Sequence, residues 1–367
     1  MAQIPLLAEP VDADVAGGTP RDLLAACLSL RAGEPLVERL AALTAAEWEV
    51  LVARALRHEV APLVGARLAD EPGLAVPPAA ARAMEEAYAA TSSSNARMYR
   101  GLAEVARELG GAGIPAVVLK GAYLARGVYG DPAFRCMEDV DLLVPRPDIE
   151  RAYRVLLELG YRPENHPHLE PVYACNHHLV PMQKEGELEV ELHWSIDAVG
   201  HPRGGGPPAS PFTLRMDDLW ARVRPAGFHD AELLAFSPED LLLHLCLHAS
   251  FHHGFNITVQ KLCDIAWAAR AEPRVDWERV EATARAWNAA KLVAVTLRLT
   301  REILHAPIPA GLLPEVEWRP ADERILPVIR EYVLRAPRRD TDERARRRRV
   351  INPWLGGVTG MLGRGAE

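Results

Sequence analysis

The stretch that decides the fold is IPAVVLKGAYLARGVYGDPAFRCMEDVDLLV, residues 114–144. It begins with a short apolar run, residues 116–119, which predicts a strand ending at Lys120-Gly121. A helical segment follows, and residues 139–144 predict a second strand. Because side chains alternate between the two faces of a strand, we expect Asp139 and Asp141 to share one face and the apolar residues the other.

The pair Asp139 and Asp141 points to chemistry. Like charges on one face, roughly 6 to 7 Å apart in apolar surroundings, repel each other. A divalent cation removes this cost, and Mg²⁺ binds through a few carboxylates while leaving positions for phosphate oxygens. We therefore expect a metal site for phosphoryl or nucleotidyl transfer. The structural alternative is that Asp139 caps a turn and Asp141 is an edge-strand charge.

Two further segments favour the chemical interpretation. Gly121 follows a strand directly, so its backbone could approach a phosphate closely if a helix begins there. A third strand is predicted over residues 187–194, where Glu187, Glu189, Glu191 and His193 share one face. Beside the Asp139/Asp141 strand, this face can supply a third metal carboxylate. Taken alone, this pattern favours the structural alternative, an antiparallel strand with one solvated face.

These blocks resemble the active-site signature of the polymerase β-like nucleotidyltransferase superfamily. More closely, the chain resembles an uncharacterised bacterial nucleotidyltransferase family with three sequence blocks. Those blocks are Leu-Lys-Gly, then Arg followed by Asp-x-Asp-Leu-Leu-Val, then a strand ending in a carboxylate, Leu, His and Trp. Here they are residues 119–121, Arg135 with residues 139–144, and residues 191–194. In the wider superfamily a Ser follows the glycine, whereas here it is Ala122.

The resemblance implies a metal-dependent nucleotidyltransferase that moves a nucleoside monophosphate from an NTP, with ATP as the first choice, to an acceptor hydroxyl or phosphate. Pyrophosphate is released. Asp139 and Asp141 would bind two Mg²⁺ (or Mn²⁺) ions and Glu191 would complete the site, with Glu189 as the second choice.

The resemblance also implies contacts to the nucleotide from Lys120, the Gly121 backbone, Arg135 and His193. For Arg135 the alternative is a salt bridge to Glu138 or Asp139. For His193 it is a hydrogen bond to the neighbouring carboxylate or a purely structural role at the strand end.

The expected fold class is α+β, a small mixed-sheet nucleotidyltransferase core flanked by N-terminal and C-terminal helical domains. The expected division is 1–20, a flexible leader; 21–110, N-terminal helices; 111–200, the core; 201–235, a linker; 236–335, C-terminal helices; and 336–367, a basic tail.

Local signals support several of these helices. Thr44 and Glu47 form a predicted capping box, and Gly110-Gly111 is expected to stop a long helical pattern. Asp148 and Gly160 are expected to bound another helix, and Ser237-Pro238 to open a further one. His58 is interpreted as a surface residue beside Arg57.

Histidines gather in two places. His166, His168, His177 and His178 lie in a polar connection that we interpret as a substrate-lining or surface loop. His244, His248 and His252 recur every fourth residue, with Asp264 on the next helix. A zinc or second metal face is one interpretation. The favoured one is a core helix in which His248 hydrogen-bonds Asp264.

Composition indicates a globular protein: of 367 residues, 49% are hydrophobic and 25% charged. The net charge of -8 argues against a surface that coats nucleic acid. The five cysteines show no Cys-x-x-Cys spacing, and residues 1–18 do not resemble a secretory signal. We therefore expect reduced thiols and a cytoplasmic location, with no membrane span.

The acceptor is expected to be a protein, peptide or small molecule rather than nucleic acid, since no RNA-binding module is recognisable. The arginines of residues 338–349 predict a solvated tail, or alternatively a contact with an anionic partner. The alternative function is a non-catalytic nucleotide-binding or accessory module of a biosynthetic pathway.

Overall fold

The structure is a computed structural model that describes residues 20–30, 36–163, 177–186, 188–197, 210–228, 233–271, 273–314, 316–335, 351 and 354. Residues 1–19 of the expected leader, His166, His168 and Glu187 lie outside the described residues. So do most of the 200–211 loop and, apart from residues 351 and 354, the basic tail.

A mixed sheet forms the centre of the fold, as the sequence predicts. In the described residues its strand order is β3-β4-β5-β2-β1-β7-β6. The strands are β1 Val117–Val118, β2 Asp139–Leu143, β3 Arg162–Pro163, β4 Met182–Gln183, β5 Glu189–His193, β6 Arg224–Pro225 and β7 Leu234–Ala235. β2 pairs antiparallel with β1 and parallel with β5. β2 and β5 are therefore neighbours in the middle of the sheet.

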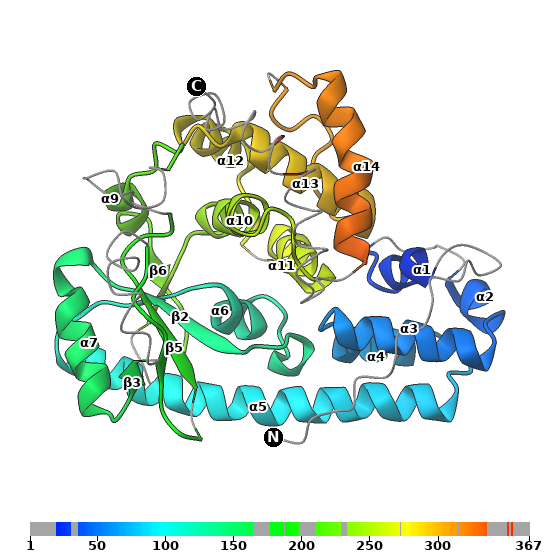
Figure 1. The fold of residues 1–367 in the computed structure, drawn as a ribbon, viewed down its shortest axis with the longest axis horizontal. Coiled ribbons are helices and arrows are strands. Elements are labelled where there is room, and N and C mark those ends of the chain that lie inside the picture. The colour runs from blue at the N-terminus through cyan, green and yellow to red at the C-terminus, as the bar shows by residue number, and fades with distance from the viewer. Residues whose placement is uncertain are drawn as a thin grey trace, which may run out of the picture.

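The N-terminal region is helical. Its helices are α1 Pro20–Cys27, α2 Leu36–Ala41, α3 Ala45–Arg57, α4 Ala61–Ala69 and α5 Pro78–Gly111. The predicted capping box of α3 is confirmed, because the Glu47 N–H donates to Thr44 and the Glu47 carboxylate accepts from the Thr44 backbone. α5 runs along one whole side of the molecule, beneath both the sheet and α4 (Figure 1).

The expected stop at Gly110-Gly111 is confirmed, because Gly111 is the last residue of α5. Ala112 is the C-cap residue, and the chain reverses at Gly113, whose φ of +69° suits glycine. Gly110 and Gly111 have normal helical geometry, so their weak helix propensity is overridden by the packing of α5.

The central segment follows the prediction more closely. α6 Lys120–Gly127 begins directly after β1, and the short turns η1 Pro132–Phe134 and η2 Arg146–Asp148 flank β2. α7 Ile149–Glu158 is followed by Gly160 at φ +92°, as expected. Asp148 is the N-cap residue, but its carboxylate binds Arg151 instead of a backbone N–H.

The C-terminal region is helical and lies on the opposite side of the sheet region from α5 (Figure 1). Its elements are α10 Pro238–Leu247, the π-helical turn η3 His248–His252, α11 Val259–Arg270, α12 Trp277–Ala286, α13 Ala290–Leu304 and α14 Pro320–Leu334. Ser237 caps α10 by accepting the Asp240 N–H, which confirms the predicted start. The histidine series therefore continues from α10 into a π-helical turn.

Residues 201–235, expected to be a linker, include regular structure within their described part. They include α9 Met216–Trp220 and the strands β6 and β7. β7 pairs parallel with β1, so this segment completes one edge of the sheet. The buried apolar side chains of the N-terminal helices, the sheet and the C-terminal helices form one continuous core. The expected division into separate ranges stays a prediction.

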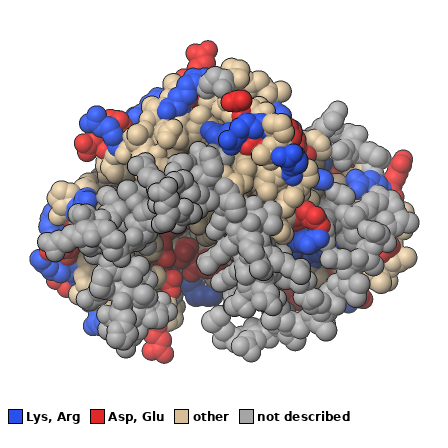
Figure 2. All heavy atoms as spheres, turned by 45° about the horizontal axis from the view of Figure 1, so that its top comes forward, with Lys and Arg blue, Asp and Glu red and all other residues tan. Residues whose placement is uncertain are grey.

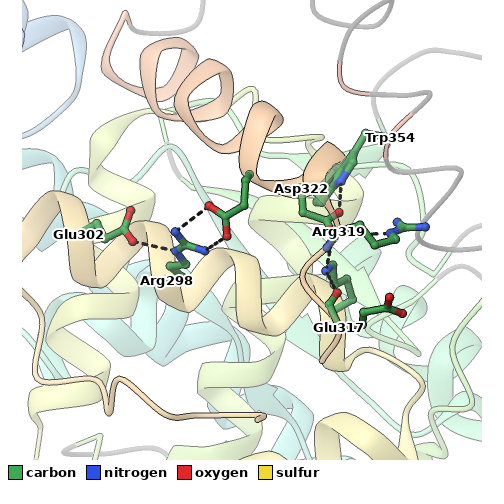
Figure 3. A network of polar contacts seen from close by, with 8 residues as sticks. Arg298, Glu302, Glu317, Arg319, Asp322 and Trp354 are labelled. Atoms are coloured by element: carbon green, nitrogen blue, oxygen red, sulfur yellow. Dashed lines mark hydrogen bonds and ion pairs between the residues drawn. The ribbon is translucent and has the colours of Figure 1, made fainter. Parts of the chain in front are cut away.

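The start of α14 is held by a buried carboxylate (Figure 3). Asp322 accepts hydrogen bonds from the Arg319 N–H, Lys291 Nζ and Trp354 Nε1 at 2.7, 2.7 and 2.9 Å. Its side chain is fully buried. These bonds hold the pKa of Asp322 down at about 2, although burial works in the opposite direction.

The visible surface carries mixed charge. On the face shown in Figure 2, basic and acidic side chains are interspersed over the described surface, and acidic side chains are visible inside a central hollow. No helix in the described part of the chain is long and apolar enough to cross a bilayer.

Candidate functional site

The site is built on the parallel pairing of β2 with β5. The register places Asp139 opposite Glu189 and Asp141 opposite Glu191. Residues opposite each other in a sheet present their side chains to the same face. Asp139, Asp141 and Glu191 therefore face one side, as the alternation in the sequence predicts, and the apolar residues between them are buried in the core.

Asp141, Glu191 and His193 form a compact group of donor atoms. One possible ligand atom from each side chain lies within 4.8 Å of the other two. Among the described residues, no other group of three His, Cys, Asp or Glu side chains brings its ligand atoms this close together. His193 Nε2 lies 2.8 Å from Asp141 Oδ1 and 3.4 Å from Glu191 Oε2. The imidazole thus joins the two carboxylates, and Asp141 and His193 are almost completely buried.

Asp139 shares the face but is not part of that compact group. Burial, together with the charges of Asp141 and Glu191, raises its pKa to about 6. The carboxylate is therefore poorly compensated by the protein. Glu189 is the first residue of β5, and its carboxylate accepts a hydrogen bond from Gln183 at the surface. This geometry favours Glu191 over Glu189 as the third carboxylate.

Lys120 reaches the same carboxylates from the first residue of α6. Its Nζ donates to Asp141 Oδ1 at 2.9 Å, and its backbone lies at φ +40°. Burial opposes the lysine charge, but Asp141 and its acidic neighbours outweigh burial and raise the pKa of Lys120. Lys120 and His193 in turn hold the pKa of Asp141 well below its usual range, against the effect of burial.

Gly121 lies where the backbone passes very close to a guanidinium. A Cβ at this position would lie 2.4 Å from Arg135 Nη1 and 3.2 Å from Arg135 Cζ. Glycine is therefore required here by Arg135. Gly121 also lines the cavity at the beginning of α6. The expected close approach of a phosphate to its backbone stays a prediction.

Arg135 binds a partner that the sequence did not indicate. Its Nε and Nη2 donate to Asp264 at 3.1 and 2.9 Å, and Tyr129 donates to the same carboxylate at 3.0 Å. The alternative of a salt bridge to Glu138 or Asp139 is wrong. Despite its ion pair, Arg135 lines the cavity.

The proposed hydrogen bond between His248 and Asp264 is also wrong, because Asp264 is bound by Arg135 and Tyr129. His248 Nε2 instead lies 3.0 Å from His253 Nε2. His244 and His252 follow at ring separations of 6.1 and 6.0 Å from His248. In the described part of the chain these rings do not bring three ligand atoms within 4.8 Å of one another.

A cavity of about 510 Å³ opens over the acidic face. The sheet and α6 form one wall, and η3 with the start of α11 forms the opposite wall. Six histidines line it: His177, His178, His193, His248, His252 and His253. Burial is the main cause that lowers the pKa of His252 to about 3 and of His253 to about 4, so these two rings are neutral at pH 7. The expectation that the His177/His178 connection lines a substrate site agrees with this cavity.

Other cavity residues come from segments that the sequence did not single out, among them Glu59, Gln260 and Lys261. Glu59 follows α3 in the left-handed region, at φ +62°, and its carbonyl accepts from Gln260 Nε2 at 2.9 Å. The neighbouring His58 is fully buried, so its interpretation as a surface residue is wrong. His58 accepts the Val259 N–H at the start of α11 and contacts the Leu334 carbonyl.

These residues fit a divalent cation. Carboxylate oxygens are the ligands that hard cations prefer, and Asp141 and Glu191 present them beside His193. Asp139 adds a third carboxylate, whose pKa is raised by burial and by repulsion from Asp141 and Glu191. A bound cation would relieve that repulsion.

A mixed sheet with paired acidic strands lies next to a Lys-Gly helix start and beneath a polar cavity, which is the arrangement that the sequence comparison with nucleotidyltransferases led us to expect. Residues 44–305 match the family described as uncharacterised nucleotidyltransferase, and the chain belongs to this family. It is thus a nucleotidyltransferase.

The solved structures that resemble the chain include the crystal structure of an antigenic nucleotidyltransferase-like protein from Paracoccidioides brasiliensis. The sequence identity is 15% and the TM-score 0.36, and the match covers 60% of this chain and 97% of that one. No curated protein matches the chain.

Proposed function

We propose that the protein transfers a nucleoside monophosphate from an NTP to an acceptor hydroxyl or phosphate, in a reaction that depends on a divalent metal and releases pyrophosphate. The observation that carries this proposal is the register that sets Asp141 of β2 directly opposite Glu191 of β5. Membership of the family supports the transfer of a nucleotidyl group.

Asp139, Asp141 and Glu191 are the proposed metal ligands. When bound, Mg²⁺ or Mn²⁺ would polarise the phosphate oxygens and lower the pKa of the attacking hydroxyl. His193 bonds Asp141 and contacts Glu191, so its role in this proposal is to hold both carboxylates in place.

Lys120 and Gly121 are the proposed phosphate contacts. Lys120 begins α6, where free backbone N–H groups and the helix dipole favour an anion. Its ammonium already bonds Asp141, so it lies at the boundary between the carboxylates and the incoming phosphates. Arg135 adds positive charge to the same cavity while Asp264 keeps its guanidinium fixed.

The chain carries a net charge of -8, and carboxylates stand beside the three cationic side chains of the cavity, whereas a nucleic-acid backbone binds to a continuous basic surface. We therefore propose a protein, peptide or small-molecule acceptor, and ATP as the first NTP to test.

The decisive experiment is transfer labelling. Purified protein is incubated with each α-³²P-labelled NTP, Mg²⁺ and a lysate of the source cells, and labelled products are identified by mass spectrometry. The proposal predicts a labelled acceptor, release of pyrophosphate and loss of both with EDTA. Asp141→Asn should give no label, and the surface variant Asp148→Asn should behave like wild type. Stoichiometric NTP binding without pyrophosphate release would instead identify a non-catalytic nucleotide-binding module.

A further inference from the structure

The cavity contains three cationic side chains, and they are not equivalent. Lys120 donates to Asp141 at 2.9 Å, and Arg135 is bound on two nitrogens by Asp264. Lys261, on the first turn of α11, lines the same cavity, and its side-chain ammonium forms no hydrogen bond or ion pair with the described residues. Its ammonium is therefore available to a ligand.

The fold holds Lys261 in this position. Lys261 and Asp264 are three residues apart on α11 and so share one helix face. Arg135 clamps Asp264, and His58 accepts the Val259 N–H at the start of the same helix. Lys261 therefore faces the acidic strands across the cavity, and it interacts electrostatically with Asp139 on the other wall.

An unpaired ammonium in this place is costly. Burial, followed by the nearby charge of Arg135, lowers the pKa of Lys261. The charges of Asp264, Glu59 and Asp139 act in the opposite direction but do not outweigh these effects. An anionic ligand would restore the missing compensation, and lysine binds phosphate as a point charge.

We propose that Lys261 binds the β- and γ-phosphates of the NTP, the part that leaves as pyrophosphate. In the transfer, the acceptor oxygen bonds the α-phosphorus and the bond from that phosphorus to the bridging oxygen breaks. The electron pair stays on the pyrophosphate, and the ammonium of Lys261 stabilises the growing negative charge there. The acceptor proton passes to solvent. This inference rests on the proposed function, since it takes an NTP as the substrate.

Binding measurements test the inference without requiring the acceptor. Titration calorimetry in Mg²⁺ compares NTP with the NMP of the same base for wild type, Lys261→Met and Lys261→Arg. Loss of a charge-assisted contact should weaken NTP binding by about 10-fold or more in Lys261→Met. NMP binding should stay within about 2-fold, because NMP lacks the phosphates concerned. Lys261→Arg should retain most of the NTP affinity, and a general packing defect would not produce this pattern.

Two controls complete the design. Lys184→Met removes a lysine that contacts Glu104 and lies outside the cavity, and it should bind NTP like wild type. Removing a poorly compensated charge should leave the melting temperature of Lys261→Met equal to or above that of wild type. If Lys261→Met melts well below wild type, Lys261→Gln takes its place.

The results separate the two proposals. Wild-type NTP affinity in a folded Lys261→Met, or equal losses for NTP and NMP, would overturn the role of Lys261 and leave the proposed function standing. A wild-type protein that binds no NTP in Mg²⁺ would overturn both.

Discussion

Arg135, in the loop before β2, and Asp264, on α11, form a bidentate ion pair with N–O distances of 3.1 and 2.9 Å. Both side chains are almost fully buried. The pair joins the segment that carries the acidic strand to the helix that forms the opposite wall of the cavity. It therefore sets the distance between the two walls.

Breaking this pair should strongly destabilise the protein. Arg135→Met leaves the Asp264 carboxylate buried, with Tyr129 as its remaining hydrogen-bond donor among the residues that the structure describes. Removing one partner of a buried ion pair costs about 3–5 kcal/mol. Urea denaturation at pH 7 measures the loss. Arg154→Met, which removes an exposed pair with Glu150, should cost less than about 1 kcal/mol. Equal effects of the two variants would show that the buried pair does not stabilise the fold.

Adding one methyl group at Gly121 should also destabilise the fold. The new Cβ would lie 2.4 Å from Arg135 Nη1, and Arg135 is fixed by Asp264. Overpacking of this kind costs about 1–3 kcal/mol. Gly110→Ala is the matched control, because nothing lies within 4 Å of its Cβ inside α5. It should stabilise the helix by about 0.5–1 kcal/mol. Differential scanning calorimetry of both variants gives the comparison, and opposite signs are expected.

Neutralising Asp141 should abolish transfer while the fold persists. Asp141→Asn keeps the shape but removes the charge that Lys120 and His193 both bind. Loss of several kcal/mol of metal-assisted stabilisation predicts a rate at least ~10³-fold lower. Pyrophosphate release measures the rate, and circular dichroism checks the fold. Unchanged turnover in this variant would remove Asp141 from the metal site.

Asp322 should make the protein sensitive to acid. Its pKa of about 2 in the folded state lies below the ordinary value of 3.8. The stabilisation is therefore fully present above about pH 4 and is lost as the pH falls toward 2. This difference between the folded and unfolded pKa of Asp322 adds on the order of 2 kcal/mol to the free energy of unfolding at neutral pH.

Urea titrations of wild type and Asp322→Asn from pH 7 down to pH 2 would measure this contribution. The stability advantage of wild type should shrink between pH 4 and pH 2. Trp354→Phe removes one of the three hydrogen bonds to Asp322 (Figure 3). Its free energy of unfolding should therefore fall less between pH 4 and pH 2 than that of wild type. If the difference in free energy of unfolding between wild type and Asp322→Asn does not change with pH, the charge of Asp322 does not stabilise the fold.

The sequence by itself determined the local features. Strand alternation placed Asp139 and Asp141 on one face, and Glu191 with His193 on the next strand, because a two-residue period needs no tertiary information. The Thr44/Glu47 capping box and the Ser237 cap were also readable, since their partners are three residues away. The start of α6 at Lys120 followed from the end of an apolar run.

Only the tertiary structure decided which of these features meet. The strand containing Glu191 was compatible with an antiparallel, solvated arrangement, and its parallel register with β2 is set by packing of the sheet. The partner of Arg135 lies 129 residues away, and His58 contacts α11 and α14 from 201 and 276 residues away. No local pattern encodes such pairs, because they depend on how helices dock on the sheet. For the same reason, the sequence did not predict that Lys261 and the six cavity histidines line one cavity. Their proximity depends on how η3, α11 and the sheet pack around it.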